Sequence, residues 1–186
     1  RVRFQKRGEL RAISHLDTMR AFERALRRSQ LPLRFSEGFN PKPRLSFPVA
    51  LGVGIESLDE VMEFDLRDWT PASEVERRLR GQLPPGLELL SLRVADPHAS
   101  ARAVEVEYRA TVPPALRDDP RLSPAGLESL LAREDIPVRR MRKGKEKVVN
   151  LRPFIRRLTR DGADVVMAFG AGPEGSRLGA LSPSRA

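Results

Sequence analysis

The apolar residues of this chain follow two periods, and their succession predicts the order of strands and helices. Apolar residues occupy alternate positions in 1–6 and 60–66, which is typical of half-buried strands. They recur every three or four positions after Ser14 and after Pro71, which indicates amphipathic helices that begin there. Further strands are expected at 33–35, 45–51 and 87–94. The predicted order in the first half is therefore strand, helix, strand, then strand, helix, strand.

The second half repeats this order of elements without repeating the sequence. The expected elements are a strand at 103–112, a helix from Ser123, strands at 137–142 and 145–151, a short helix at 153–158 and a strand at 163–169. Both halves then have the βαββαβ pattern of ferredoxin-like folds. We predict an α+β protein with two such lobes in tandem, at 1–96 and 97–186. The second lobe ends in a Gly-, Ser- and Pro-rich tail from Gly170 that we expect to be mobile.

The start of the first helix carries a capping signature and one of the two histidines. Ser14 and Asp17 match the S-x-x-[DE] capping box, in which each side chain satisfies a free backbone N–H. Capping is a sufficient role for both residues. His15 lies between them, with its ring exposed or turned toward a neighbouring loop. Because imidazole titrates near neutral pH, it suits proton transfer or phosphate contact, so His15 is the candidate catalytic residue.

The stretch from Ser36 to Phe47 is too irregular for a plain helix or strand. Gly38 and two prolines punctuate it, as in a loop. Polar side chains are more numerous than a turn requires, which indicates that the loop holds a ligand. The candidates are Glu37, Asn40, Lys42 and Arg44. We predict an insertion in the first lobe that faces the helix start at Ser14.

The charge balance favours a polyanionic partner. The 186 residues carry a formal net charge of +9 with a pI of about 11.0, and only five of the 34 basic residues are lysines. Arginine presents a planar fork that suits phosphate and carboxylate. Nucleic acid, an acidic protein or anionic lipid would complement this charge. A GC-rich genome also raises arginine content, and a soluble protein can be basic without such a partner.

Two groups of cations are candidates for contact with a polyanion. Arg20 and Arg24 lie about one turn apart on the first helix, where like charges repel and invite an anion between them. The alternative is a solvated face on which Arg20 pairs with Asp17. The predicted hairpin carries six cations and one acid, which either follow a phosphate backbone or keep the hairpin tip soluble. These cations are Arg139, Arg140, Arg142, Lys143, Lys145 and Lys147.

Missing residue types and motifs exclude several functions. Without cysteine the chain forms no disulfide, thiolate nucleophile or cysteine-ligated zinc or iron–sulfur centre. A small metal site of His15, Asp17 and Glu37 would need the loop to fold back onto the helix start. No phosphate-loop or dinucleotide fingerprint is present, and we expect neither a metal nor a cofactor. No segment resembles a membrane span or a signal peptide, so we expect a cytoplasmic protein that binds no membrane.

Three stretches resemble the radical-SAM-linked protein family, a bacterial domain of unknown function. They are Leu10–Arg20, Phe35–Phe47 and Val149–Pro153, and the resemblance spans nearly the whole chain. Members of that family occur alone or fused behind a B12-binding-type radical SAM protein, often beside a gene for an RNase G-type ribonuclease. The resemblance implies work on RNA or ribosomes. Lys42 replaces the family's usual histidine, which argues against a two-histidine metal or acid–base site. Asn150 replaces an aspartate that is common in the family.

These features together predict an RNA-binding accessory or substrate-presenting module for RNA modification or processing. Its partners would be RNA of the tRNA or rRNA class and a radical SAM protein, encoded separately or fused. Because aromatic residues make up only 5% of the chain, we expect recognition of the RNA backbone or shape. Its RNA-binding site would combine the hairpin cations with Arg20, Arg24, Glu37, Asn40, Lys42 and Arg44.

Two alternatives remain open. Tandem ferredoxin-like lobes with a histidine at the start of the first helix resemble CRISPR repeat-processing enzymes, so His15 could serve a metal-free endoribonuclease. The chain could instead be a protein-interaction domain that docks on an acidic partner.

Overall fold

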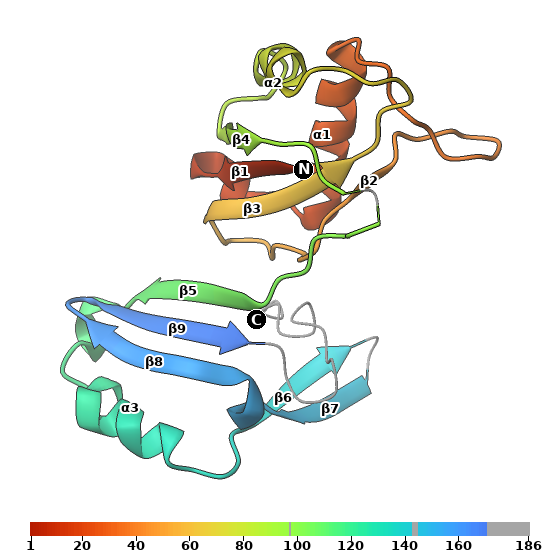
Figure 1. Ribbon diagram of the computed structural model, residues 1–186. Coiled ribbons are helices and arrows are strands. Elements are labelled where there is room, and N and C mark those ends of the chain that lie inside the picture. The colour runs from red at the N-terminus through yellow and green to blue at the C-terminus, as the bar shows by residue number, and fades with distance from the viewer. Residues whose placement is uncertain (97, 143–144, 171–186) are drawn as a thin grey trace. The chain divides into compact units, whose positions relative to one another are not determined.

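The computed structural model describes residues 1–96, 98–142 and 145–170 (Figure 1). These residues form a mixed α+β structure with three α-helices and three antiparallel sheets. They divide into two compact units, unit 1 of Arg1–Arg102 and unit 2 that begins at Ala103. No helix within the described ranges is long and apolar enough to cross a bilayer.

Unit 1 is built on a four-stranded antiparallel sheet with the strand order β2-β3-β1-β4. Its elements are β1 (Val2–Lys6), η1 (Gly8–Ala12), α1 (His15–Arg28), β2 (Leu45–Ser46), β3 (Ser57–Phe64), α2 (Ala72–Arg80) and β4 (Leu87–Leu92). Each α-helix connects a central strand to an edge strand, α1 from β1 to β2 and α2 from β3 to β4. The order of strands and helices predicted for the first half is therefore present.

The core of unit 1 lies between the sheet and its two helices. Val2 and Phe4 of β1 are at most 1% exposed and belong to one cluster with Phe22 of α1 and Leu79 of α2. The rings of Phe4 and Phe22 meet edge to face, with their centroids 4.7 Å apart. Alternation along β1 places Lys6 on the same inward face, where it is completely buried.

The capping signature marks the observed start of α1. The Ser14 hydroxyl accepts a hydrogen bond from the backbone N–H of Asp17 at 3.2 Å and donates one to its carboxylate at 2.6 Å. Hydrogen bonds from the Ser14 side chain and backbone lower the pKa of the Asp17 carboxyl. Ala21 and Ala25 lie on the buried side of this helix, where small side chains allow it to pack closely on the sheet.

Two expected strands of unit 1 are shorter than predicted. Residues 33–35 contribute only isolated bridges, from Leu33 to Leu66 and from Phe35 to Pro43. The strand expected at 45–51 is reduced to the two residues of β2. Proline has no N–H to donate, and the prolines on both sides of β2 limit the ladder there.

Unit 2 departs from the predicted second ferredoxin-like lobe. Its strands form a three-stranded sheet of order β5-β9-β8 and a separate two-stranded sheet of β6 and β7. Its elements are β5 (Glu105–Thr111), η2 (Pro114–Leu116), η3 (Pro120–Leu122), α3 (Pro124–Leu131), β6 (Pro137–Arg142), β7 (Lys145–Asn150), η4 (Arg152–Phe154), β8 (Ile155–Asp161) and β9 (Asp164–Gly170). Leu127 of α3 packs against Val112 and Val165 in a small core.

The helix predicted at 153–158 is wrong. Only a 3₁₀ turn forms, at Arg152–Phe154, and β8 follows it directly. Strands β8 and β9 pair up to Asp161 and Asp164, which leaves a two-residue turn at 162–163. Gly162 has a φ of 57°, which glycine tolerates at the first position of such a turn. The turn at Gly162 favours a hairpin, and residues 155–161 form a strand of it although their apolar spacing also suits a helix. The expected mobile tail lies outside the described residues from 171 onward.

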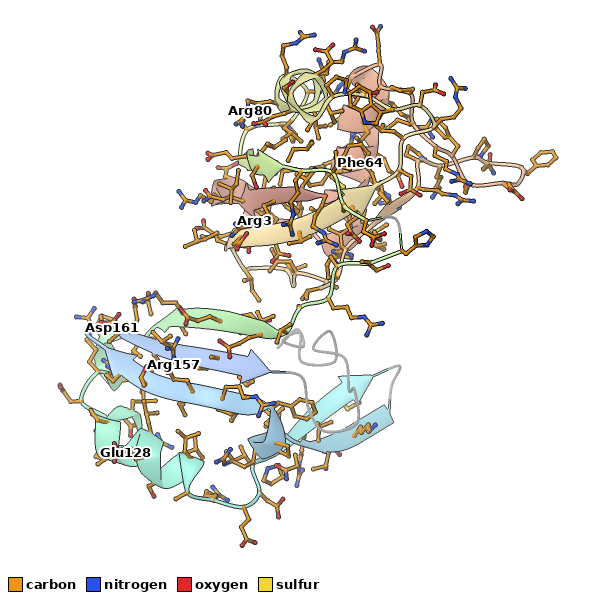
Figure 2. The ribbon with its side chains drawn as sticks, viewed as in Figure 1. Arg3, Phe64, Arg80, Glu128, Arg157 and Asp161 are labelled. Atoms are coloured by element: carbon orange, nitrogen blue, oxygen red, sulfur yellow. The ribbon has the colours of Figure 1, made fainter. Side chains whose placement is uncertain are left out.

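Ion pairs cross one face of the three-stranded sheet in unit 2. Arg157 and Asp161 of β8, labelled in Figure 2, pair with Glu107 and Arg109 of β5, with 2.7 Å between Arg109 and Asp161. These side chains pass over the central strand β9, whose Val166 is opposite Arg109 and is only 6% exposed. The charged side chains therefore shield an apolar strand from solvent.

Candidate functional site

Residues 36–42 form a loop that projects from unit 1 between α1 and β2 and has a fixed base (Figure 1). The backbone N–H of Ser36 donates to the Lys42 carbonyl at 2.8 Å, and the N–H of Lys42 donates to the Ser36 hydroxyl at 3.1 Å. Closer to the sheet, the N–H of Arg44 donates to the Arg34 carbonyl at 2.9 Å. Asp65, just after β3, exchanges backbone hydrogen bonds with both arginines at 3.0 and 3.1 Å.

The tip of this loop presents an aromatic ring to solvent. Phe39 is 103% exposed, and its neighbours Glu37 and Asn40 are exposed as well. Gly38 turns the chain with a φ of 122°, a conformation that glycine tolerates best. A ring held this far from the core contributes nothing to folding through burial, whereas its faces are free to stack on a flat ligand.

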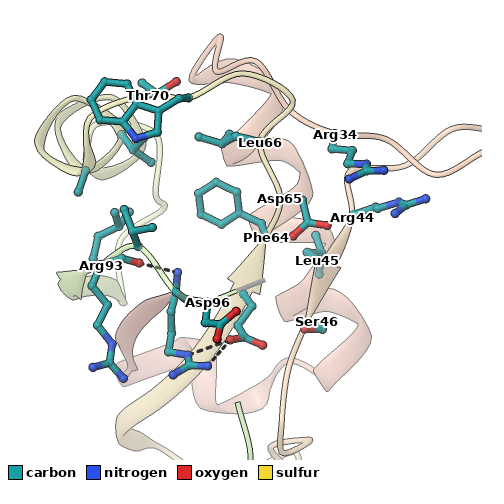
Figure 3. A pocket seen from close by; sticks show the side chains of 18 of the residues that line it. Arg34, Arg44, Leu45, Ser46, Phe64, Asp65, Leu66, Thr70, Arg93 and Asp96 are labelled. Carbon is teal, nitrogen blue, oxygen red and sulfur yellow. Dashed lines mark hydrogen bonds and ion pairs between the residues drawn. The ribbon is translucent and has the colours of Figure 1, made fainter. Parts of the chain in front are cut away.

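Cations surround the base of the loop. Lys42, Arg34 and Arg44 are exposed, and none of their side chains forms an ion pair or hydrogen bond with a residue in the described ranges. Figure 3 shows the guanidinium groups of Arg34 and Arg44 side by side, with Asp65 next to them. Two adjacent guanidinium forks suit a phosphate group, because each can donate two parallel hydrogen bonds.

Residues 36–42 contact the last turn of α1, whereas Phe47, at the end of the predicted Ser36–Phe47 stretch, contacts His15 in the first turn. Nη2 of Arg27 donates to the Pro41 carbonyl at 3.0 Å, and the same guanidinium lies 5.1 Å above the centre of the Phe35 ring. Helix α1 has 14 residues. Its two ends are separated by about 20 Å at 1.5 Å per residue. Residues 36–42 therefore lie at the far end of α1 from Ser14, while the Phe47 end of the predicted stretch reaches the helix start.

The two candidate arginines of α1 differ in their distance from the loop: Arg20 lies about two turns before Arg27, and Arg24 about one turn before it. Arg20 is paired with Asp17 at 3.1 Å, which is the solvated ion pair given above as the alternative. Arg24 is exposed and has no ion pair within the described part of the chain. Lys42 and Arg44 remain together at the loop, and Glu37 and Asn40 lie at its tip.

His15 is the first residue of α1 and is half-buried. Its ring meets the ring of Phe47 edge to face at 5.2 Å, and Phe47 in turn contacts Phe4 and Phe22 of the core. Burial lowers the pKa of His15, and the positive charge of Lys6 lowers it further. His15 is therefore biased toward its neutral form and held against the edge of the core.

Lys6 and Glu60 form a charged group under the start of α1. The Lys6 ammonium donates to the Ile13 carbonyl at 3.3 Å. Burial lowers the pKa of Lys6, and the negative charge of Glu60 raises it. Burial likewise raises the pKa of Glu60, while a hydrogen bond from Ser57 and the charge of Lys6 lower it. Each charge therefore favours the ionised form of the other in a site that disfavours both.

Acidification is expected to destabilise unit 1 through His15. The pKa of His15 is lower in the folded state than the 6.5 of an ordinary histidine. The unfolded state therefore binds a proton first as pH falls. The stabilisation is complete above pH 6.5 and is lost as pH falls through the folded pKa. We expect the parent's free energy of unfolding to fall more steeply between about pH 7 and pH 5.5 than that of the His15→Gln variant.

Urea unfolding followed by circular dichroism at the two pH values measures this difference. His98→Gln is the matched control, because His98 is exposed and its replacement should leave the pH dependence unchanged. An identical pH dependence in the parent and the His15 variant would contradict the prediction.

The basic hairpin of unit 2 places cations opposite each other. Arg140 pairs with Lys147 and Arg142 with Lys145 in the β6–β7 ladder. The register therefore gathers cationic positions on the two paired strands. Lys147 and Arg139 are exposed, and Arg139 is 3.4 Å from Glu146. Lys143 lies outside the described residues, as do the side chains of Arg140, Arg142 and Lys145.

Asn150 holds the end of β7 to the segment just before β6. Its Oδ1 accepts hydrogen bonds from the backbone N–H groups of Ile136 at 2.9 Å and Arg152 at 3.0 Å. Its amide nitrogen donates to the Asp135 carboxylate. An aspartate at this position would place two carboxylates together, whereas the amide of Asn150 satisfies Asp135.

Sequence reasoning missed Lys6, Glu60 and Arg34. The alternation of β1 could have identified Lys6, which shares its face with Val2 and Phe4, and Glu60 likewise shares a face with Met62. Arg34 has a weaker signal, since only its position across the loop from Arg44 distinguishes it. Within the described ranges no group of three or more His, Asp or Glu side chains could hold a metal ion.

Unit 1, with its projecting loop, and unit 2, with its basic hairpin, define a basic α+β protein. Residues 1–177 match the family described as "Uncharacterized protein conserved in bacteria (DUF2344)", and the chain belongs to this family. No curated protein matches the chain.

Proposed function

We propose that this protein binds RNA and acts as an accessory or substrate-presenting module in RNA modification or processing. The observation that carries the proposal is the loop of residues 36–42, which presents Phe39 at its tip above the unpaired cations of its base. Stacking of a base on an aromatic ring contributes about 1–3 kcal/mol, and it tolerates any base. Cations that neutralise phosphates release counterions, which adds affinity at low salt.

The basic hairpin of unit 2 supports the same proposal. The register pairs the position of Arg140 with that of Lys147 and the position of Arg142 with that of Lys145, so these four positions belong to one face of the ladder. A phosphate backbone that follows these cationic positions would release counterions, which adds affinity. Both units would then contribute to binding, unit 1 through the loop and unit 2 through this hairpin.

The finer assignments are part of this proposal. The element order and strand order of unit 1 support a ferredoxin-like fold for that unit. The RNA would be of the tRNA or rRNA class, and the resemblance to the radical-SAM-linked family points to a radical SAM enzyme as the partner. The protein would act in the cytoplasm. A role for His15 in cleavage is not part of the proposal, because its ring is held against Phe47.

Fluorescence anisotropy of a labelled single-stranded RNA tests the proposal. We expect the parent to bind, and its affinity to fall steeply as salt rises from about 50 to 200 mM. Phe39→Ala should weaken binding about tenfold without changing the slope against salt, because it removes stacking and no charge. Phe39→Trp, the matched control, should retain the parent's affinity.

Two outcomes would contradict the proposal. Binding that does not respond to salt would indicate a contact other than phosphate neutralisation. Absence of RNA binding, combined with binding to an acidic peptide, would indicate a protein-interaction domain instead.

A further inference from the structure

A cavity of about 810 Å³ lies in unit 1 where β3 ends and the chain leads to α2. Its floor is apolar and includes Phe64, Leu66 and Leu92, which pack against the core from its outer side. Pockets of about 300–1,000 Å³ with an apolar floor and a few polar groups are typical of sites for small ligands. The cavity is therefore large enough for a nucleobase and its sugar.

Trp69 lies on the rim of this cavity and is 82% exposed. The residues beside it are occupied with each other: Arg67 donates to the Asp68 carboxylate at 3.0 Å, and the Thr70 hydroxyl donates to the Asp68 carbonyl at 3.4 Å. These contacts hold the segment that carries the indole while leaving the indole itself in solvent. An exposed indole next to an apolar floor provides a surface on which a flat ring can stack.

Unpaired arginines stand on both sides of the floor. Figure 3 shows Phe64 between Arg93 on one side and Arg34 and Arg44 on the other. None of these three guanidinium groups has an ion pair with a residue that the structure describes, whereas Arg1 in the same cavity is bound to Glu63 at 2.7 Å. The carboxylates of Glu63 and Asp68 in the same lining are paired with Arg1 and Arg67, whereas Asp65 and Asp96 have no ion pair among the described residues. A strand that crosses the cavity would meet a free guanidinium before and after the apolar floor, with these two carboxylates close by.

We infer that this cavity holds an unpaired base of the bound RNA. The base stacks on Trp69 over the apolar floor, and the phosphates on its two sides lie at Arg93 and at the Arg34–Arg44 pair. The bases of a duplex are stacked inside the helix and do not reach such a cavity. The inference rests on the proposed RNA binding and specifies its target as a single-stranded segment or a loop.

The intrinsic fluorescence of the protein tests the inference, because Trp69 is the only tryptophan in the chain. A single-stranded oligoadenylate should quench this fluorescence with the same midpoint as its anisotropy isotherm. The RNA duplex with oligouridylate should bind through its phosphates without quenching. Trp69→Leu should weaken binding of the single strand about tenfold and leave duplex binding unchanged. Trp69→Phe should retain most of the affinity, which separates lost stacking from misfolding.

The outcomes distinguish this inference from the proposed function. Binding of the single strand without quenching, or equal quenching by the duplex, would overturn the base-binding cavity and leave RNA binding standing. Quenching by an acidic peptide but not by RNA would assign the cavity to a protein partner. Absence of any RNA binding by anisotropy would overturn the proposed function itself, and the inference with it.

Discussion

Replacing Arg34, Lys42 and Arg44 together by glutamine is expected to weaken RNA binding about 100-fold at about 0.1 M salt. These three cations surround the base of the loop, and none has an acidic partner in the described ranges. Each phosphate contact to a single strand contributes about 0.7 to the slope of log affinity against log salt. At about 0.1 M salt, each lost contact then costs about a factor of five, and the slope should fall by about two.

A second triple variant separates these contacts from general charge. Arg3, Arg77 and Arg80 also belong to unit 1 but are paired with acids at 2.5, 2.7 and 2.6 Å, and Figure 2 shows Arg3 and Arg80 away from the loop. Replacing these three by glutamine changes the net charge by the same amount and should change RNA affinity only slightly. Equal losses in both triple variants would show that the loop is not a specific contact site.

Glu60→Gln is expected to destabilise unit 1 by about 1–2 kcal/mol at neutral pH, because it removes the negative charge that raises the pKa of Lys6. Lys6 has no exposed surface, and its ammonium bonds to a carbonyl directly before the helix cap at Ser14. The positive end of the helix dipole lies there, which disfavours a cation. His15, whose pKa is lowered by the charge of Lys6, cannot balance that charge because imidazole is never an anion at this pH. Glu60 supplies the compensating charge, and glutamine would keep its shape while leaving the buried cation without it.

Lys6→Met tests whether this reasoning is correct. Methionine fills a similar volume and removes both the cation and the cost of its desolvation, so we expect a loss below about 1 kcal/mol. The double variant Lys6→Met, Glu60→Gln should be nearly as stable as Lys6→Met alone, since no cation is left to compensate. Glu88→Gln, on the exposed side of β4, is the matched control.

Hydrogen exchange at the amides of β1 and α1 measures the opening free energy of unit 1 separately from unit 2. A Glu60→Gln variant as stable as the parent would contradict the assigned role of Glu60. A Lys6→Met variant that loses more stability than Glu60→Gln would show that Lys6 itself holds the start of α1 in place.

Much of the secondary structure could be predicted because local signals and packing agree. The Ser14–Asp17 signature marks the start of α1, and Ser123 likewise caps α3 by accepting a hydrogen bond from the Gly126 N–H at 3.1 Å. The β6–β7 hairpin also forms at the predicted positions. The helix predicted at 153–158 failed because apolar spacing alone cannot exclude a strand whose turn is fixed by Gly162.

The arrangement of the site was less predictable, because it depends on which end of a long helix a loop reaches. Connectivity between α1 and β2 allows either end. The contact of Arg27 with the Pro41 carbonyl and the Phe35 ring holds the loop at the far end from His15. Tertiary contacts decide which end of this 14-residue helix the loop contacts, and no local sequence pattern predicts it.

Because the base of the loop is closed by hydrogen bonds, ligand binding at the tip is separate from the stability of unit 1. Backbone hydrogen bonds among Arg34, Arg44 and Asp65 hold both arms of the loop to the end of β3, and they involve no side chain of the tip. Substitutions and length changes at 37–41 should therefore have little effect on the packing of the core of unit 1. Ligand preference can diverge between family members at this tip while the scaffold below it is retained, which makes the segment a natural place to graft a different recognition sequence.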